Sequence, residues 1–152
     1  MPIKCAGAPQ KILYLWTDQW RKQNLPIDVE FFKTVAVMFG VPKYSKTLTE
    51  VAASYNIKTT FKTPLIKVKG NEATFQNLDT KEIIVKKFDF LHIVPSMGAH
   101  SYIADSGLGD ASGFLDCNKD TMRHNKYPNI WGIGDCTSTP NAKTAAAAFA
   151  QT

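Results

Sequence analysis

The residues best suited to chemistry near the end of the sequence are two glycines, an aspartate and a cysteine, in the run Gly132-Ile133-Gly134-Asp135-Cys136. Small residues at the end of a strand let a ligand approach the backbone, and a carboxylate can accept hydrogen bonds from ligand hydroxyls. The spacing Gly-x-Gly-x-x-Thr lacks the third glycine of the pyrophosphate fingerprint, so it disfavours a first-strand dinucleotide site. From the residues alone, a plain glycine turn that leads into a helix fits equally well.

Two distant cysteines are the second chemical feature. Cys5 and Cys136 each come shortly before a predicted helix, where the helix dipole lowers the pKa of a thiol and favours the reactive thiolate. They are 136 − 5 = 131 positions apart, so only folding brings them together. A disulfide between them requires Cα atoms within about 7 Å. The alternative for each of them, and for Cys117, is a buried apolar thiol.

Other site chemistries find no support in the spacing of residues. The sequence has no Cys-x-x-Cys or His-x-x-x-His pattern, and His92, His100 and His124 occur in unrelated contexts, so we expect no metal site. No nucleophile-elbow motif supports a serine-type triad. His92 falls in a predicted buried strand, and we expect it to be a hydrogen-bonded core residue.

Helices and strands alternate in the first part of the chain. Hydrophobic periodicity predicts helices over residues 9–20 and 44–55, and β-rich runs predict strands over 27–32 and 57–62. Parallel strands need crossover connections, so this order favours a parallel sheet covered by helices. Three further short strands, at 65–69, 73–75 and 83–85, predict an antiparallel hairpin or meander.

The second part of the chain is predicted to return to the main sheet. Residues 88–94 are nearly continuously apolar, which is typical of a buried strand. Residues 129–136 predict a strand that ends in a tight turn, and 143–151 predict a helix. The expected fold class is α/β, a partial Rossmann-like doubly wound parallel sheet with an inserted antiparallel hairpin or meander.

Composition sets the broad class of the protein. The 152 residues are 44% hydrophobic and 20% charged, as in a globular unit, and no apolar run approaches the roughly 20 residues that cross a bilayer. The net charge of +5 comes mainly from lysines in the strand-rich segment. A solvated strand face is the favoured explanation, with an anionic partner or membrane surface as the alternative. Only two arginines and no nucleic-acid module argue against nucleic-acid binding.

Two motifs carry a family resemblance. Residues 130–136, followed by Lys143-Thr144-Ala145-Ala146-Ala147, resemble the second flavin-contacting motif of two-dinucleotide-binding-domain flavoproteins of the disulfide-reductase superfamily. The cysteine directly after Asp135, together with Lys4-Cys5-Ala6-Gly7-Ala8-Pro9-Gln10-Lys11, is similar to mitochondrial-type sulfide:quinone oxidoreductases. Residues 39–44 and 127–129 also resemble segments of that family, so the resemblance spans essentially the whole chain.

The resemblance implies FAD as cofactor. It places the ribityl contact on Asp135 beside Gly134, and the contacts of the following helix end on Lys143, Thr144 and Ala145. It also implies that Cys5 and Cys136 oxidise hydrogen sulfide, hold the sulfur as a persulfide and pass electrons through FAD to ubiquinone. We expect Cys136 to receive sulfide and Cys5 to interact with the flavin.

Partners and location also follow from the resemblance. The sulfur would pass to a small acceptor such as glutathione or sulfite. The intact protein would lie on the mitochondrial inner membrane as a peripheral protein, attached through regions not present in this chain.

The resemblance further implies that the chain is the central fragment of a two-domain flavoprotein. Residues 1–125 would form the second, NAD-like Rossmann-type domain without its first strand, and residues 126–152 would begin the returning FAD-domain segment. The N-terminal FAD fingerprint and a C-terminal membrane and quinone-binding region are missing, so we expect these residues alone to be inactive and not to hold FAD.

One loop departs from the family pattern, and two other functions stay open. Pro95-Ser96-Met97-Gly98-Ala99-His100 keeps only the first proline and the methionine of a proline-rich loop, which puts its flavin or sulfur contacts in doubt.

The first alternative function is another FAD-dependent quinone reductase, similar to type II NADH dehydrogenase. The second is a non-enzymatic α/β module that binds a partner or carries persulfide.

Overall fold

The computed structural model describes residues 5–152, which form two compact units. One unit is Gly7–Ile93, and the other is Val94–Thr152 together with Cys5 and Ala6. Each unit has a hydrophobic cluster of its own. The expected division into a Rossmann-type domain over residues 1–125 and the start of a returning segment over residues 126–152 stays a prediction.

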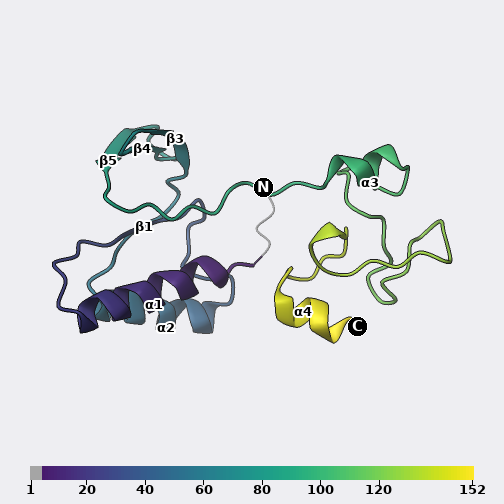
Figure 1. Ribbon diagram of the computed structural model, residues 1–152, viewed down its shortest axis with the longest axis horizontal. Helices are drawn as coiled ribbons and strands as arrows, with labels where there is room; N and C mark the ends of the chain where they lie inside the picture. The colour runs from purple at the N-terminus through teal and green to yellow at the C-terminus, as the bar shows by residue number, and fades with distance from the viewer. Residues whose placement is uncertain (1–4) are drawn as a thin grey trace. The chain divides into compact units, whose positions relative to one another are not determined.

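Two helices and a two-stranded parallel sheet organise Gly7–Ile93. Helices α1 (Ala8–Lys22) and α2 (Pro42–Ser54) each carry a proline in the first turn, where its missing N–H costs no hydrogen bond. Strands β1 (Glu30–Phe32) and β2 (Lys58–Thr60) pair in parallel, with Phe31 opposite Thr59. Figure 1 shows α1 and α2 side by side, as the predicted alternation of helices and strands requires.

Alternate side chains of β1 pack in different directions, because successive residues of a strand point to opposite faces. Phe31 packs with α1 and α2 on the buried cluster of Met38, Ala52 and Ile57. Phe32 stacks on Phe75, with ring centres 3.9 Å apart. The short parallel sheet therefore has the helices on one face and the meander next to the other.

The meander consists of β3 (Leu65–Lys69), β4 (Glu72–Gln76) and β5 (Ile83–Lys87), all antiparallel. Gly70 turns the chain from β3 to β4 with φ +56°, a conformation that glycine adopts without steric cost. On the central strand Ala73 and Phe75 are buried, whereas Lys67, Lys69 and Lys87 on the outer strands are exposed. This arrangement fits the predicted solvated strand face.

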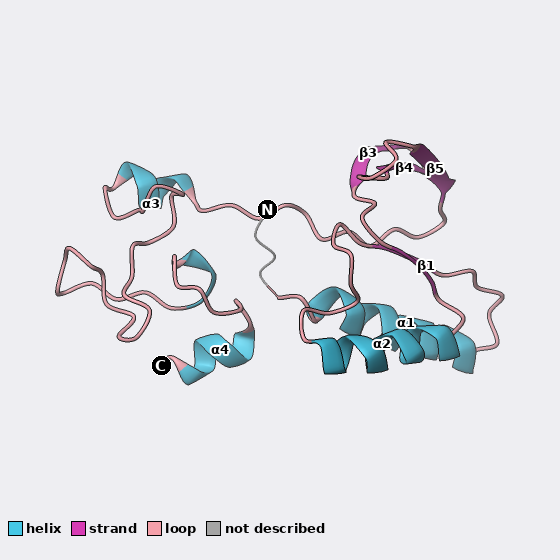
Figure 2. Cartoon of the chain, turned by 180° about the vertical axis from the view of Figure 1, so that it is seen from behind, coloured by secondary structure: helices cyan, strands magenta, loops and turns pink. Residues whose placement is uncertain are grey.

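The unit of Val94–Thr152 has little regular structure (Figure 2). It contains α3 (Ser101–Asp105), the 3₁₀ helix η1 (Gly134–Cys136) and α4 (Ala145–Ala150). Isolated bridges join its loops in place of strands, and Ile103, Leu115 and Cys117 form its buried cluster.

Three predictions from the sequence are wrong. Residues 88–94 form no strand. Of these, only Phe88 donates a backbone hydrogen bond within the described chain, to the carbonyl of Asn71 at 3.0 Å, and Phe90 and His92 pack against Trp16 of α1. His92 is accordingly exposed and is not a core residue. Residues 129–133 form only the bridge Arg123↔Trp131 before η1 begins.

Within residues 5–152, no helix combines the length and the apolar character that crossing a bilayer requires.

Candidate active site

Backbone pairing between two loops holds Cys136 in place. Leu115 and Thr137 form a parallel bridge, the N–H of Leu115 donates to the carbonyl of Cys136 at 2.8 Å, and the N–H of Ser138 donates to Leu115 at 3.0 Å. Cys136 ends η1, and its thiol donates to the carbonyl oxygen of Ile133 at 3.3 Å. The half-buried Cys136 packs against the cluster that contains Leu115 and Cys117.

Both glycines of the predicted motif have a structural reason to be glycine. A Cβ atom at Gly132 would lie 2.3 Å from Cδ2 of Leu115 and 3.2 Å from Sγ of Cys117, so a side chain there cannot fit without movement of the loops. Gly134 has φ +70° and starts η1. Tight packing at Gly132 was not foreseen from the sequence, which left open a ligand-approach position and a plain glycine turn.

The three cysteines differ in environment, and none of them forms a disulfide within residues 5–152. Cys117 is only 6% exposed, and burial raises the pKa of its thiol, with a further contribution from neighbouring Cys136. The alternative stated for Cys117, a buried apolar thiol, is therefore correct. Cys5 and Cys136 are half-buried. The pairing of Cys5 with Cys136 stays a prediction, since no contact between their sulfur atoms is found.

Lys143 is a buried cation, 8% exposed. Its ammonium group donates to the backbone carbonyl of Thr139 and, at 2.8 Å, to the Thr139 hydroxyl. Thr144 is the N-cap of α4, and its hydroxyl accepts from the N–H of Ala147 at 3.0 Å. These contacts order the 139–145 loop, which the sequence alone assigned only as the start of a helix.

A cavity of about 530 Å³ lies beside Lys143. Three loops line it, at 97–99, 110–114 and 137–143. Gly134, Asp135, Cys136 and Ala145 are not among its lining residues. The structure thus brings Lys143 together with the Met97 loop, which the sequence had left in doubt.

One polar atom of the cavity lining has no partner. The side-chain Oδ1 of Asn141 is enclosed and accepts no hydrogen bond from the residues that the structure describes. An enclosed acceptor without a donor is costly, so a bound molecule with an N–H group would suit this position. Asn141 was missed in the sequence, where only its place between Asp135 and Lys143 could have drawn attention to it.

Within residues 5–152, no group of three or more His, Cys, Asp or Glu side chains converges in a way that could hold a metal ion. His124 is 4% exposed, and its Nδ1 accepts from the N–H groups of Lys126 and Tyr127. Its Nε2 therefore carries the proton and donates to the carbonyl of Leu108 at 3.0 Å. His124 orders a loop.

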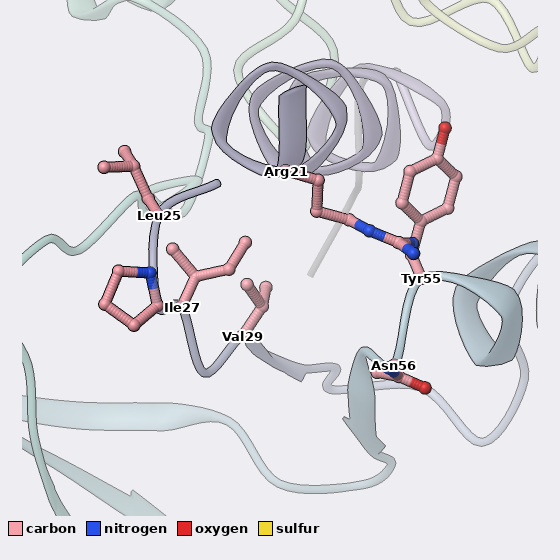
Figure 3. Close-up of a pocket in the computed structure, with 7 residues that line it drawn as sticks. Arg21, Leu25, Ile27, Val29, Tyr55 and Asn56 are labelled. Carbon is pink, nitrogen blue, oxygen red and sulfur yellow. The ribbon is translucent and has the colours of Figure 1, made fainter. Parts of the chain in front are cut away.

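A second, smaller cavity of about 270 Å³ lies in the unit of Gly7–Ile93 (Figure 3). Leu25, Ile27 and Val29 line one side, and Arg21 and Tyr55 line another. The guanidinium of Arg21 donates to the carbonyl of Ser54 at 3.1 Å and lies over the Tyr55 ring. Arg21 thus satisfies a carbonyl at the end of α2, which accounts for its charge without a ligand.

Comparisons with known proteins give the family. No protein-family model matches the chain. The chain is 42% identical over 155 residues to the mitochondrial sulfide:quinone oxidoreductase of Schizosaccharomyces pombe, covering 98% of this chain and 34% of that protein. It is 41% identical to the mitochondrial sulfide:quinone oxidoreductase of Mus musculus, covering 99% of this chain and again 34% of the relative.

Solved structures agree on the fold. The sulfide:quinone oxidoreductase of Aquifex aeolicus matches 90% of this chain and 34% of its own with a TM-score of 0.77 at 16% identity. Thioredoxin reductase of Lactococcus lactis matches 89% and 45%, with a TM-score of 0.66 at 17% identity. The expected α/β class, with a small parallel sheet and an antiparallel meander, is confirmed. Nearly the whole chain is homologous to a segment that makes up about one third of the length of mitochondrial sulfide:quinone oxidoreductases. This confirms the family recognised from its motifs.

Proposed function

We propose that this chain belongs to a protein that oxidises hydrogen sulfide and passes the electrons through FAD to ubiquinone. The observation that carries the proposal is the identity of 41–42% with sulfide:quinone oxidoreductases over 98–99% of the chain. The chain spans about a third of the length of those relatives, so the activity belongs to the longer protein. Its place is the mitochondrial inner membrane, as a peripheral protein, and its sulfur acceptor is a small molecule such as glutathione or sulfite.

Within that protein, the residues of this chain proposed to carry sulfur are Cys5 and Cys136. Oxidation of sulfide to a persulfide requires exchangeable sulfur atoms and an acceptor for two electrons. Both thiols are half-buried and free, which leaves them available for exchange, in contrast to the buried Cys117. In our assignment Cys136 receives sulfide and Cys5 interacts with the flavin.

We propose that the flavin end of FAD lies at the larger cavity. The unpartnered Oδ1 of Asn141 offers an acceptor to the N–H of an imide, a group that the flavin ring contains, and the cavity of about 530 Å³ lies in the size range of small-molecule sites. Of the residues that the family resemblance assigns to FAD, only Lys143 lines this cavity. By that resemblance we assign Gly134 and Asp135 to the ribityl chain, and Lys143, Thr144 and Ala145 to the ring end. Bound FAD would supply the two-electron acceptor that thiols alone lack.

We also propose the domain assignment, with residues 1–125 as the NAD-like domain without its first strand and residues 126–152 as the start of the returning FAD-domain segment. The α/β order of the first 60 residues supports it. A second function, as in FAD-dependent quinone reductases that use NADH, is disfavoured by the names and identity of the relatives. Reduction of quinone by NADH and not by sulfide would replace the proposal with that alternative.

The test is quinone reduction by sulfide in the longer protein loaded with FAD, with three single substitutions. Cys5→Ser and Cys136→Ser are expected to lower the rate by at least about 100-fold, the usual scale for loss of a covalent participant. Cys117→Ser is the matched control and should leave the rate nearly unchanged. If only Cys5→Ser lowers the rate, the second reactive sulfur lies in a part of the longer protein that this chain does not cover. Full activity with both thiols removed would end the proposal.

A further inference from the structure

Lys33 is a buried lysine that the proposed function does not use. It follows β1 directly and is only 9% exposed. Its ammonium nitrogen lies 5.1 Å from the centre of the Phe31 ring. Across residues 5–152, neither a hydrogen bond nor an ion pair reaches that nitrogen. Buried charges are normally paired with an opposite charge, so the lack of an acceptor calls for an explanation.

The position of Lys33 in the fold is one where ligands bind. It lies at the carboxyl end of the parallel strands β1 and β2, where its N–H donates to Thr60 at 2.8 Å. In open α/β sheets, ligands bind in the crevice outside the carboxyl ends of parallel strands. The smaller cavity around Arg21 lies at the opposite ends of the strands, so it is a different place.

Both helices of this unit begin at the same end as Lys33. Gln10 in the first turn of α1 donates to the carbonyl of Met38 at 2.7 Å, and Met38 lies in the loop that joins β1 to α2. At the other end Arg21 of α1 donates to Ser54 of α2, so the two helices run in the same direction. Neither helix has a side-chain cap or an acidic residue in its first turn. Their unpaired N–H groups therefore add positive potential to this end.

A second polar group on the same face also lacks a partner. Thr59 lies opposite Phe31 in the parallel register, so its side chain shares the helix-covered face with Phe31 and Lys33. The hydroxyl oxygen of Thr59 is enclosed and has no hydrogen-bond partner among the described residues.

We propose that Lys33, with the first turns of α1 and α2, binds a small oxyanion at the carboxyl ends of β1 and β2. The shared chemistry is a compact group with several anionic oxygens, either a free ion such as sulfite or phosphate or the phosphate end of a larger molecule. A lysine ammonium recognises such a group as a point charge, and the helix N–H groups donate to its oxygens. The inference does not rest on sulfide oxidation, and neither sulfide nor quinone enters its test.

The test is an NMR titration of the ¹⁵N-labelled 152-residue chain with sodium sulfite, sodium phosphate and glycerol phosphate, at constant pH and ionic strength. We expect saturable shifts at the amides of residues 33–41 and of the first turns of α1 and α2. The ion that binds most tightly distinguishes a free oxyanion from a phosphate ester. Lys33→Gln should weaken binding at least about tenfold, and Lys33→Arg should retain it.

Lys58→Gln is the matched control, because Lys58 is an exposed lysine that already pairs with Asp28 at 2.8 Å. It should bind as the unaltered chain does. The circular-dichroism spectrum and melting curve of each variant confirm that it folds. Equal affinity in the Lys33→Gln variant, or no saturation with any of the three anions up to about 10 mM, would overturn the proposal.

Discussion

The ammonium nitrogen of Lys33 lies 5.1 Å from the centre of the Phe31 ring, two residues earlier on the same face of β1. A cation over an aromatic face is attracted by the ring, but the attraction offsets only part of the cost of removing the charge from water. Burial accordingly lowers the pKa of Lys33 below its usual value. In the absence of an anion, this lysine is a source of instability.

Lys33→Met is therefore expected to raise the free energy of unfolding of the chain at pH 7, by about 1 kcal/mol. Between the lowered pKa of the folded state and the usual lysine pKa of about 10.4, the unfolded chain binds more protons than the folded one. Stability of the unaltered chain thus rises with pH across that window, and the gain from the substitution shrinks. Urea unfolding at a series of pH values measures both effects.

Saturating phosphate should reverse the order of stability, because an anion that binds only the folded state stabilises it. The Lys33→Met variant should gain little from phosphate. If the variant is less stable than the unaltered chain at pH 7 without any anion, then Lys33 already has a stabilising partner and this explanation fails.

Gly132→Ala is expected to destabilise the chain by about 1–3 kcal/mol, the usual cost of an overfilled core. The new Cβ would lie 2.3 Å from Cδ2 of Leu115, in the loops that hold Cys136. Gly98→Ala is the matched control, since a Cβ there would meet nothing within 4 Å and Gly98 has no positive φ. Melting temperatures of both variants test the prediction, and equal values would contradict it.

The first half of the fold could be predicted because its signals are local. Pro9 and Pro42 in first turns, with apolar residues at helical spacing, predict α1 and α2 within a few residues of their observed bounds. The alternation in β4 predicts the meander, where Ala73 and Phe75 are buried. Such patterns depend on neighbours in the sequence, so they do not require knowledge of the rest of the protein.

The second half could not be predicted in the same way, because its apolar residues serve contacts that the sequence does not display. Phe90 suggests a buried strand, yet it is 56% exposed and packs its ring on Trp16. Whether an apolar run becomes a strand depends on a partner for its backbone, and residues 89–94 have none within the described chain. In the candidate site, the motif in the sequence singles out Lys143, whereas the enclosed Asn141 oxygen is visible only in three dimensions.

The three thiols should react with iodoacetamide at different rates, with Cys117 the slowest. Burial both blocks access to Cys117 and raises its pKa, which lowers the fraction of reactive thiolate at neutral pH. Cys5 and Cys136 are half-buried and should react first. Mass spectrometry of peptides after timed alkylation gives each rate. In urea the three rates should converge, and a fast Cys117 in the folded chain would contradict its buried position.

The purified 152-residue chain is expected to be colourless and to retain no FAD after gel filtration. It covers about 34% of the length of its relatives, and the residues assigned here to FAD concern only the ribityl chain and the ring. Binding of the adenosine and pyrophosphate parts would then depend on residues outside the chain, and a ligand that loses these contacts loses much of its affinity. Absorbance at the flavin band after addition of excess FAD is the measurement, with the longer protein as the positive control. Stoichiometric yellow protein from these 152 residues would show that the cofactor contacts lie here to a greater extent than we assign.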